Sequence, residues 1–166
     1  MNGILSARMR EAGMPFRLIF GVELPRLQSI AGEFSPDAGL ARQLWEQSIR
    51  ETRLLAIMLM PPADLTLEVA RHWSETLLTA EEAQVMAMML LPQTSFARQL
   101  CLEWLDGEDD LPATCACLCL RHLHVRGQDI TCDDRQHIVD RLASWQPKAS
   151  LHLRKAIQAL RDTLAI

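Results

Sequence analysis

Apolar residues recur at intervals of three and four along most of the chain. Leu40, Leu44 and Trp45 follow this spacing in one segment, and Val69 and Trp73 follow it in another. Such spacing places apolar side chains on one face of an α-helix. Proline, glycine and capping residues separate the segments. The pattern predicts ten helices, at residues 2–12, 23–34, 37–48, 50–60, 66–78, 80–91, 95–106, 112–126, 133–145 and 149–165.

Several of these helices have an identifiable start. Thr79 and Glu82 have the spacing of a capping box, in which the hydroxyl and the later carboxylate satisfy free backbone amides. Pro36 and Pro112 lie where a helix can begin, because the first turn has no use for the missing amide. We therefore expect helix starts at these three places.

The helices group into two-helix units of about 30 residues. Each of four units contains one tryptophan, at positions 45, 73, 104 and 145. Helix pairs that cannot bury their apolar faces alone stack on their neighbours and form an α-solenoid. The pattern therefore predicts a solenoid of stacked antiparallel helix pairs, as in HEAT-like or ARM-type repeats, in one domain over residues 1–166. A compact helical bundle is the alternative, which periodicity alone does not exclude.

Composition supports the all-α interpretation. The 166 residues include 27 Leu and 19 Ala but only 9 Ile, 5 Val and no Tyr, so helix formers outnumber the residues that strands prefer. The net charge is −4, which argues against a surface covered with bound nucleic acid but leaves room for a local basic patch.

Neither a membrane span nor a secretion signal is predicted. No apolar run approaches about 18 residues, and Arg8, Arg10 and Glu11 interrupt the N-terminal segment. We therefore expect a cytoplasmic protein. Its five cysteines are then expected to be reduced thiols rather than disulfides.

Residues 16–60 carry a family resemblance. The stretch FRLIFGVELPRLQSIA at 16–31 resembles the aromatic-Gly-Val-x-x-Pro-x-Leu-x-x-Ile-Ala opening of the DNA alkylation repair family, the HEAT-like-repeat alkylpurine DNA glycosylases. The LA at 40–41, the LW at 44–45, the ETRLLA at 51–56 and the LRKAIQALR at 153–161 are also similar to that family. The resemblance implies an α-solenoid over the whole chain, in a short member that lacks an N-terminal portion.

The matched residues also have a physical interpretation. Gly21 provides a turn position without a side chain, and Pro25 lies in the first turn of a helix. Leu27, Ile30 and Ala31 lie on one helix face, and Trp45 is expected to be a packing anchor between helices. These residues identify a fold and not a chemistry.

The resemblance implies an aspartate that stabilises positive charge at the sugar, flanked by aromatic residues, after the helix that contains Trp73. Residues 77–84 read LLTAEEAQ and contain neither an aspartate nor an aromatic residue. The arginine that the family has near the start of a following helix would fall at residues 113–114, which are Ala and Thr. We therefore predict no catalytic residue and no base-excision activity. An active enzyme that uses Glu81 or Glu82 instead is the alternative.

Candidate DNA contacts lie at the C-terminal end of the chain. They are Lys148, Arg154, Lys155 and Arg161, with Asp162 as the one acid beside them. Arg154 and Arg161 are seven residues apart and share a helix face, as Lys148 and Lys155 do if the helix extends that far. Clustered cations of this kind bind phosphates. A solvated helix face is the alternative interpretation, and the GEDD loop at 107–110 opposes DNA binding.

Two other groups could suggest chemistry. Cys115, Cys119 and His122 lie on one helix face and include ligands that suit zinc, but a continuous leucine-rich helix favours buried thiols. The second group is Cys132, His137 and Asp140, whose proximity in sequence does not make a catalytic triad. No phosphate-binding glycine loop or dinucleotide motif occurs, so we expect neither a metal nor a cofactor.

Two functions follow as hypotheses. The first is a DNA-repair-related solenoid without excision activity that binds duplex DNA weakly. The second is a scaffold that binds a peptide or protein on its concave face. Arginine and lysine on the binding surface would favour nucleic acid, whereas methionine, leucine and tryptophan surrounded by acids would favour protein.

Overall fold

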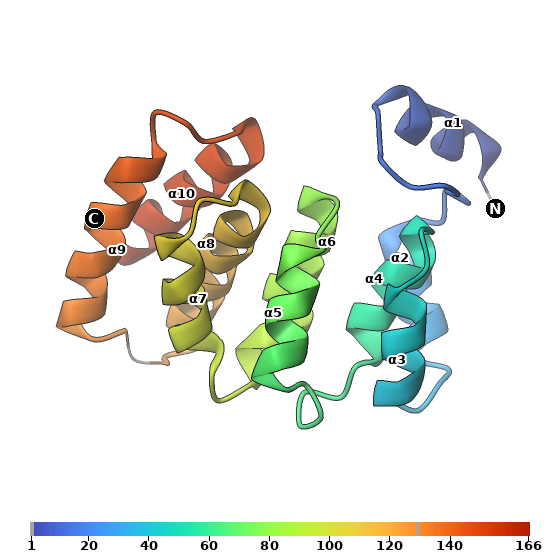
Figure 1. The fold of residues 1–166 in the computed structure, drawn as a ribbon, viewed down its shortest axis with the longest axis horizontal. Coiled ribbons are helices and arrows are strands. Elements are labelled where there is room, and N and C mark those ends of the chain that lie inside the picture. Colours follow the sequence, from blue (N-terminus) through green and yellow to red (C-terminus); the bar gives the residue numbers. More distant parts are fainter. Residues whose placement is uncertain (1, 129) are drawn as a thin grey trace. The chain divides into compact units, whose positions relative to one another are not determined.

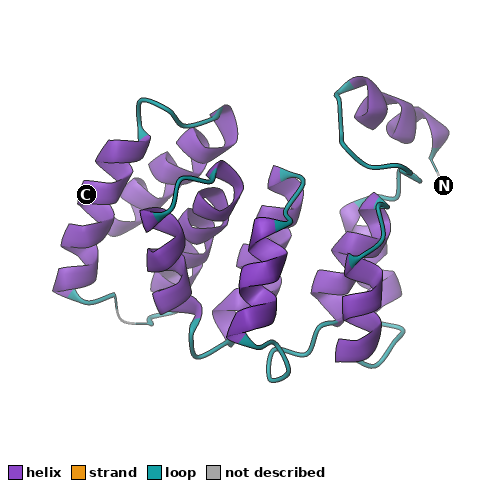
Figure 2. Ribbon diagram, in the orientation of Figure 1, coloured by secondary structure: helices purple, strands orange, loops and turns teal. Residues whose placement is uncertain are grey.

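The computed structural model describes residues 2–128 and 130–166, which form ten α-helices joined by turns and loops (Figures 1 and 2). All ten predicted helices are present. Within these residues no β-strand occurs, and Leu18 and Ile49 form an isolated parallel bridge. None of the described helices is long and apolar enough to cross a membrane. The chain divides into two compact units, residues 2–66 (unit 1) and 67–166 (unit 2).

Unit 1 contains four helices, α1 (Gly3–Glu11), α2 (Leu24–Ala31), α3 (Ala38–Trp45) and α4 (Arg50–Leu59). Helix α4 packs against both α2 and α3. Of the three residues of α2 that the sequence placed on one face, Leu27 and Ala31 lie in the core and Ile30 is half-buried. Trp45 is also buried, with the Arg53 guanidinium 3.8 Å from its ring centroid and bonded to its carbonyl oxygen. The predicted packing role of Trp45 is confirmed.

The turn before α2 is held by a buried carboxylate. The amides of Phe20, Gly21 and Val22 donate to the Glu51 oxygens over 3.0–3.2 Å. The Arg50 guanidinium donates to the same carboxylate over 3.0 Å and to the Val22 carbonyl oxygen over 2.8 Å. Gly21 has a φ of +71°, a conformation that side chains disfavour. The matched motif around Gly21 and Glu51 therefore serves the fold.

This carboxylate makes unit 1 sensitive to acid. Burial acts to raise the pKa of Glu51, but hydrogen bonds from backbone amides and from Arg50 outweigh it and lower the pKa below its ordinary value. A carboxyl whose pKa is lower in the folded state stabilises the fold above its unfolded pKa, and this stabilisation is lost as the pH falls through the folded pKa. We expect urea midpoints of the wild type to fall below about pH 4.3, with a smaller fall in Glu51→Gln. Equal acid sensitivity in the two proteins would contradict this assignment.

Unit 2 consists of stacked helix pairs. Its α-helices are α5 (Leu67–Glu75), α6 (Ala80–Val85), α7 (Ala97–Asp106), α8 (Asp110–Val125), α9 (Cys132–Trp145) and α10 (Leu151–Leu164). Helices α5, α7 and α9 form one layer, and α6, α8 and α10 form the other (Figure 1). Helix α8 is the centre of the unit, because it packs against α6, α7 and α10 and nine of its sixteen residues are buried.

Helices α8 and α10 pack against each other. Ala113 and Cys117 of α8 and Ala156 of α10 are small side chains that are all buried. Burial raises the pKa of the Cys117 thiol to about 12, so the thiol stays neutral. Four of the five cysteines are buried and free, which confirms their interpretation as small apolar residues. Cys132, the fifth, is exposed.

The helix predicted at 80–91 changes its geometry part-way. After Val85 the chain forms a π-helix, Met86–Leu90, and then a 3₁₀ turn, Leu91–Gln93. Pro92 has no amide to donate, and its ring crowds the carbonyl four residues back in an α-helix. The Leu91 amide instead donates to the Met86 carbonyl oxygen, five residues back. The prediction of a regular helix to residue 91 was therefore wrong.

Candidate nucleic-acid interface

The two glutamates considered as substitutes for a catalytic aspartate lie in the first turn of α6. Glu82 has no exposed surface, and its Oε2 accepts hydrogen bonds from the amides of Leu78 (2.7 Å) and Thr79 (3.1 Å). The Thr79 hydroxyl oxygen accepts in turn from the Glu82 amide. The predicted capping box is therefore confirmed, and its enclosed carboxylate is out of reach of a ligand. Glu81 is half-buried beside it.

The start of α10 is fixed by a contact with α8. Ser150 caps α10 by accepting from the Leu153 amide, and both its hydroxyl and its amide donate to the Asp110 carboxylate, over 2.6 and 2.9 Å. The helix therefore begins at Leu151. Lys148 lies before it in a turn, so the condition under which Lys148 and Lys155 would share a helix face is not met.

Arg154 and Arg161 lie on one edge of α10 and reach towards the α9–α10 turn. The Arg154 Nε donates to the Ala149 carbonyl oxygen over 2.8 Å, and the Arg161 Nη1 donates to the Gln146 side-chain oxygen over 3.3 Å. These bonds hold the two guanidinium groups at the turn. The predicted shared face of Arg154 and Arg161 is confirmed.

Lys148 joins this edge from the turn itself. Its Nζ lies 4.4 Å from the centroid of the Trp145 ring, a cation–π contact, and 3.8 Å from an oxygen of the highly exposed Glu108 carboxylate. Three of the four predicted cations therefore lie around one turn. We call Lys148, Arg154 and Arg161 the turn cluster.

Lys155 directly follows Arg154 in α10. Successive residues of an α-helix are about 100° apart around its axis, so Lys155 lies on a different edge of α10 from Arg154. It lines a groove of about 190 Å³ between α6, α8 and α10. The other residues of this groove are Ala80, Gln84, Thr114, Leu118, His152 and Ala156. None of these described lining residues carries a carboxylate, and Lys155 supplies a positive charge, so the groove suits an anion. Helix α10 thus presents cations on two separate edges.

Arg121 is a further exposed cation that sequence reasoning did not single out. It lies one turn after Leu118 on α8, and its Nε donates to the Thr163 hydroxyl of α10 over 3.1 Å. Burial and the nearby charges of Arg126 and Arg121 lower the pKa of His122 beside it. No local pattern in the sequence singles out Arg121, because the residue that positions it, Thr163, lies 42 residues away along the chain.

The remaining predicted groups do not form sites. His137 Nε2 lies 2.9 Å from the Asp106 carboxylate, and Asp140 accepts from Gln136, so neither approaches Cys132 as a catalytic partner. Across residues 2–128 and 130–166, no three His, Cys, Asp or Glu side chains are placed to hold a metal ion.

Comparison with known proteins identifies the family. A family model described as DNA alkylation repair enzyme matches residues 5–163. The chain belongs to this family. No curated protein matches the chain.

The fold of this DNA alkylation repair family member is also similar to that of a solved structure. The solved protein belongs to a new family of proteins related to the HEAT-like repeat DNA glycosylases, with affinity for branched DNA structures. Its TM-score is 0.76 at 16% identity, covering 97% of this chain and 69% of the other. The predicted HEAT-like helical repeat is therefore confirmed over the compact bundle.

Proposed function

We propose that this family member binds DNA through α10 and does not excise bases. The turn cluster and Lys155 are the proposed contacts. The observation that carries the proposal is the arrangement of Arg154, whose Nε is anchored to the Ala149 carbonyl while its two terminal nitrogens have no partner among the described residues. A guanidinium held in this way is ready to bind a phosphate with both nitrogens.

The enclosure of Glu82 supports the absence of excision. The segment at 77–84, where the family resemblance places the aspartate, offers no exposed carboxylate apart from half-buried Glu81. A cytoplasmic location, where the protein could meet DNA, is part of the proposal.

Branched DNA is the proposed preferred form. The turn cluster and Lys155 lie on different edges of α10, so they can contact phosphates of two duplex arms. A related structure belongs to a family with affinity for branched DNA. The likeness in fold and the two basic edges together support this choice over a single linear duplex.

The test is fluorescence anisotropy with three labelled DNAs: an undamaged duplex, a duplex with an abasic-site analogue, and a four-way junction. We expect salt-sensitive binding that is tightest for the junction. In Arg154→Ala/Arg161→Ala the slope of log affinity against log salt is expected to become smaller by about 2, because two phosphate contacts are lost.

The matched control is Arg26→Ala/Arg42→Ala, which removes two exposed arginines of unit 1 and the same charge. Its slope is expected to stay within about half a unit of wild type. Absence of binding at low salt would overturn the proposal, as would an equal loss in the control.

A further inference from the structure

The turn between α9 and α10, around which the turn cluster lies, is held at both of its ends. At its start, the indole Nε1 of buried Trp145 donates to the Leu105 carbonyl oxygen of α7 over 2.9 Å. At its end, the Asp110 carboxylate of α8 accepts from the Ser150 hydroxyl over 2.6 Å and from the Ser150 amide over 2.9 Å. The turn therefore has one anchor on α7 and one on α8.

The anchor at Asp110 is connected to Arg154 by hydrogen bonds. Ser150, which Asp110 holds, is the N-cap residue of α10 and follows buried Ala149 directly. The Ala149 carbonyl oxygen accepts from the Arg154 Nε over 2.8 Å. A shift of Ser150 therefore moves the oxygen atom that orients the Arg154 guanidinium.

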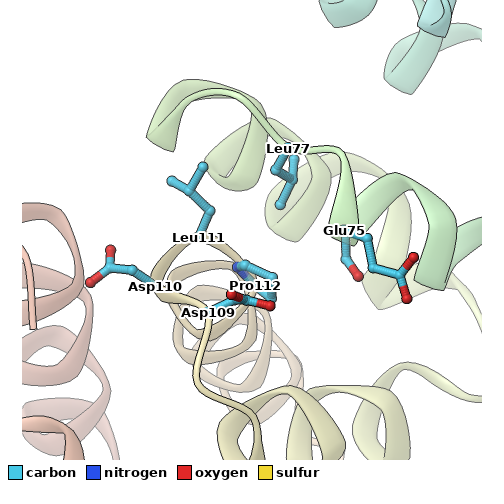
Figure 3. Close-up of a pocket in the computed structure, with 7 residues that line it drawn as sticks. Glu75, Leu77, Asp109, Asp110, Leu111 and Pro112 are labelled. Atoms are coloured by element: carbon cyan, nitrogen blue, oxygen red, sulfur yellow. The ribbon is translucent and has the colours of Figure 1, made fainter.

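The acids of the 107–110 loop have different surroundings, although the sequence presents them as one negative run. In Figure 3 the Asp110 carboxylate is directed away from Asp109, and its two bonds join it to the start of α10. Asp109 is the N-cap residue of α8 but makes no side-chain capping bond. The Glu108 side chain is 91% exposed and lies 3.8 Å from the Lys148 Nζ. Asp110 thus holds the turn, whereas Glu108 competes with phosphate for one of its cations.

We propose that Asp110 is a positioning residue for DNA binding, which fixes the α9–α10 turn so that the Arg154 guanidinium is held ready for a phosphate. This inference rests on the proposed binding of DNA by α10. A side chain that is already held in its binding geometry loses less freedom on binding, which favours binding by about two- to tenfold. The loop that opposes DNA by its charge therefore contains one acid that supports DNA binding by its geometry.

Two acids of the loop give variants of equal charge with opposite expected effects. Electrostatics alone predicts tighter DNA binding when either negative charge is removed. Glu108→Gln is expected to follow this rule, with about twofold tighter binding, because it releases Lys148. Asp110→Asn is expected to bind a four-way junction about fivefold more weakly, because the new NH₂ group cannot accept from the Ser150 amide and the turn loosens.

The measurement is fluorescence anisotropy of the whole protein with a labelled four-way junction across a salt series. In Asp110→Asn the slope of log affinity against log salt is expected to stay within about half a unit of wild type, because Arg154 keeps its charge. In an Arg154→Ala background, Asp110→Asn is expected to add at most about a twofold loss, since the positioned group is gone. An equal loss in both backgrounds would mean that Asp110 only stabilises the fold. That result, or tighter binding by Asp110→Asn, would overturn the proposal.

A second readout needs no DNA. Because the Arg154 Nε–H is bonded to the Ala149 carbonyl oxygen, its exchange with water, followed by ¹⁵N NMR, is expected to be at least about threefold faster in Asp110→Asn than in wild type. Ser150→Ala, which lacks the hydroxyl, is expected to resemble Asp110→Asn, and Ser150→Thr, which keeps one, to resemble wild type. The two Ser150 variants repeat the test if Asp110→Asn is poorly folded.

The two readouts separate this inference from the proposed function. A wild type that does not bind the junction at low salt would overturn both. Junction binding by the wild type, with affinity and Nε–H exchange unchanged in Asp110→Asn, would overturn the positioning role of Asp110 and leave DNA binding by α10 in place.

Discussion

Replacement of Glu51 by alanine is expected to lower the free energy of unfolding of unit 1 by about 3–5 kcal/mol. The change leaves the buried Arg50 guanidinium without its carboxylate. It also removes the acceptor of three backbone amides, those of Phe20, Gly21 and Val22. A loss of this size is comparable with the entire stability of a small domain, so unit 1 is expected to open readily.

Native-state hydrogen exchange of the α4 amides measures this effect within unit 1. Glu23→Ala is the matched control, because Glu23 is exposed and its side chain makes no capping bond to α2. The control is expected to change stability by about 0.5 kcal/mol at most. If Glu51→Ala exchanged no faster than Glu23→Ala, the buried carboxylate would have no role in holding the turn.

Most helices of this protein could be predicted from its sequence because they have an apolar face, and several also begin at a capping residue. The capping box at Thr79 and Glu82 is a local signal, and the structure confirms it. Where a boundary depends on a contact between distant residues, the sequence predicts it only to within a few residues. The start of α10 depends on Ser150 meeting Asp110 of α8, a pairing that no local pattern contains.

The candidate DNA contacts show the same difference between features set by local sequence and features set by contacts between distant residues. The shared face of Arg154 and Arg161 follows from helical spacing alone. The separation of Lys155 from Lys148 depends on where α10 begins. The sequence does not show which carboxylates of the 107–110 loop are engaged in the fold: Asp110 is bonded to Ser150, whereas Asp109 makes no capping bond to α8.

The buried role of Glu51 could not be inferred from the motif either. The sequence places Glu51 thirty residues from the turn that it holds, and its neighbours suggest only an amphipathic helix. A family motif can therefore identify a fold while leaving open which of its residues bind a ligand and which hold a turn.

Replacement of Gly21 by alanine is expected to destabilise the packing of α1 by about 3 kcal/mol or more. A Cβ at this position would lie 2.4 Å from the Asn2 carbonyl oxygen and 2.7 Å from the Ser6 amide nitrogen, both of them backbone atoms. The φ of +71° adds strain for any side chain. Because Ser6 is the one buried residue of α1 in the structure, the helix has few other contacts to hold it in place.

Gly13 provides a matched control for this substitution. Its φ of +78° is nearly the same, but a Cβ there would meet no atom within 4 Å. Gly13→Ala therefore tests the backbone strain alone, expected at about 1–2 kcal/mol, and the difference between the two variants measures the steric clash. We expect trypsin to cleave after Arg8 and Arg10 much faster in Gly21→Ala than in Gly13→Ala. Equal cleavage rates would mean that strain, and not the close approach of α1, explains the glycine at position 21.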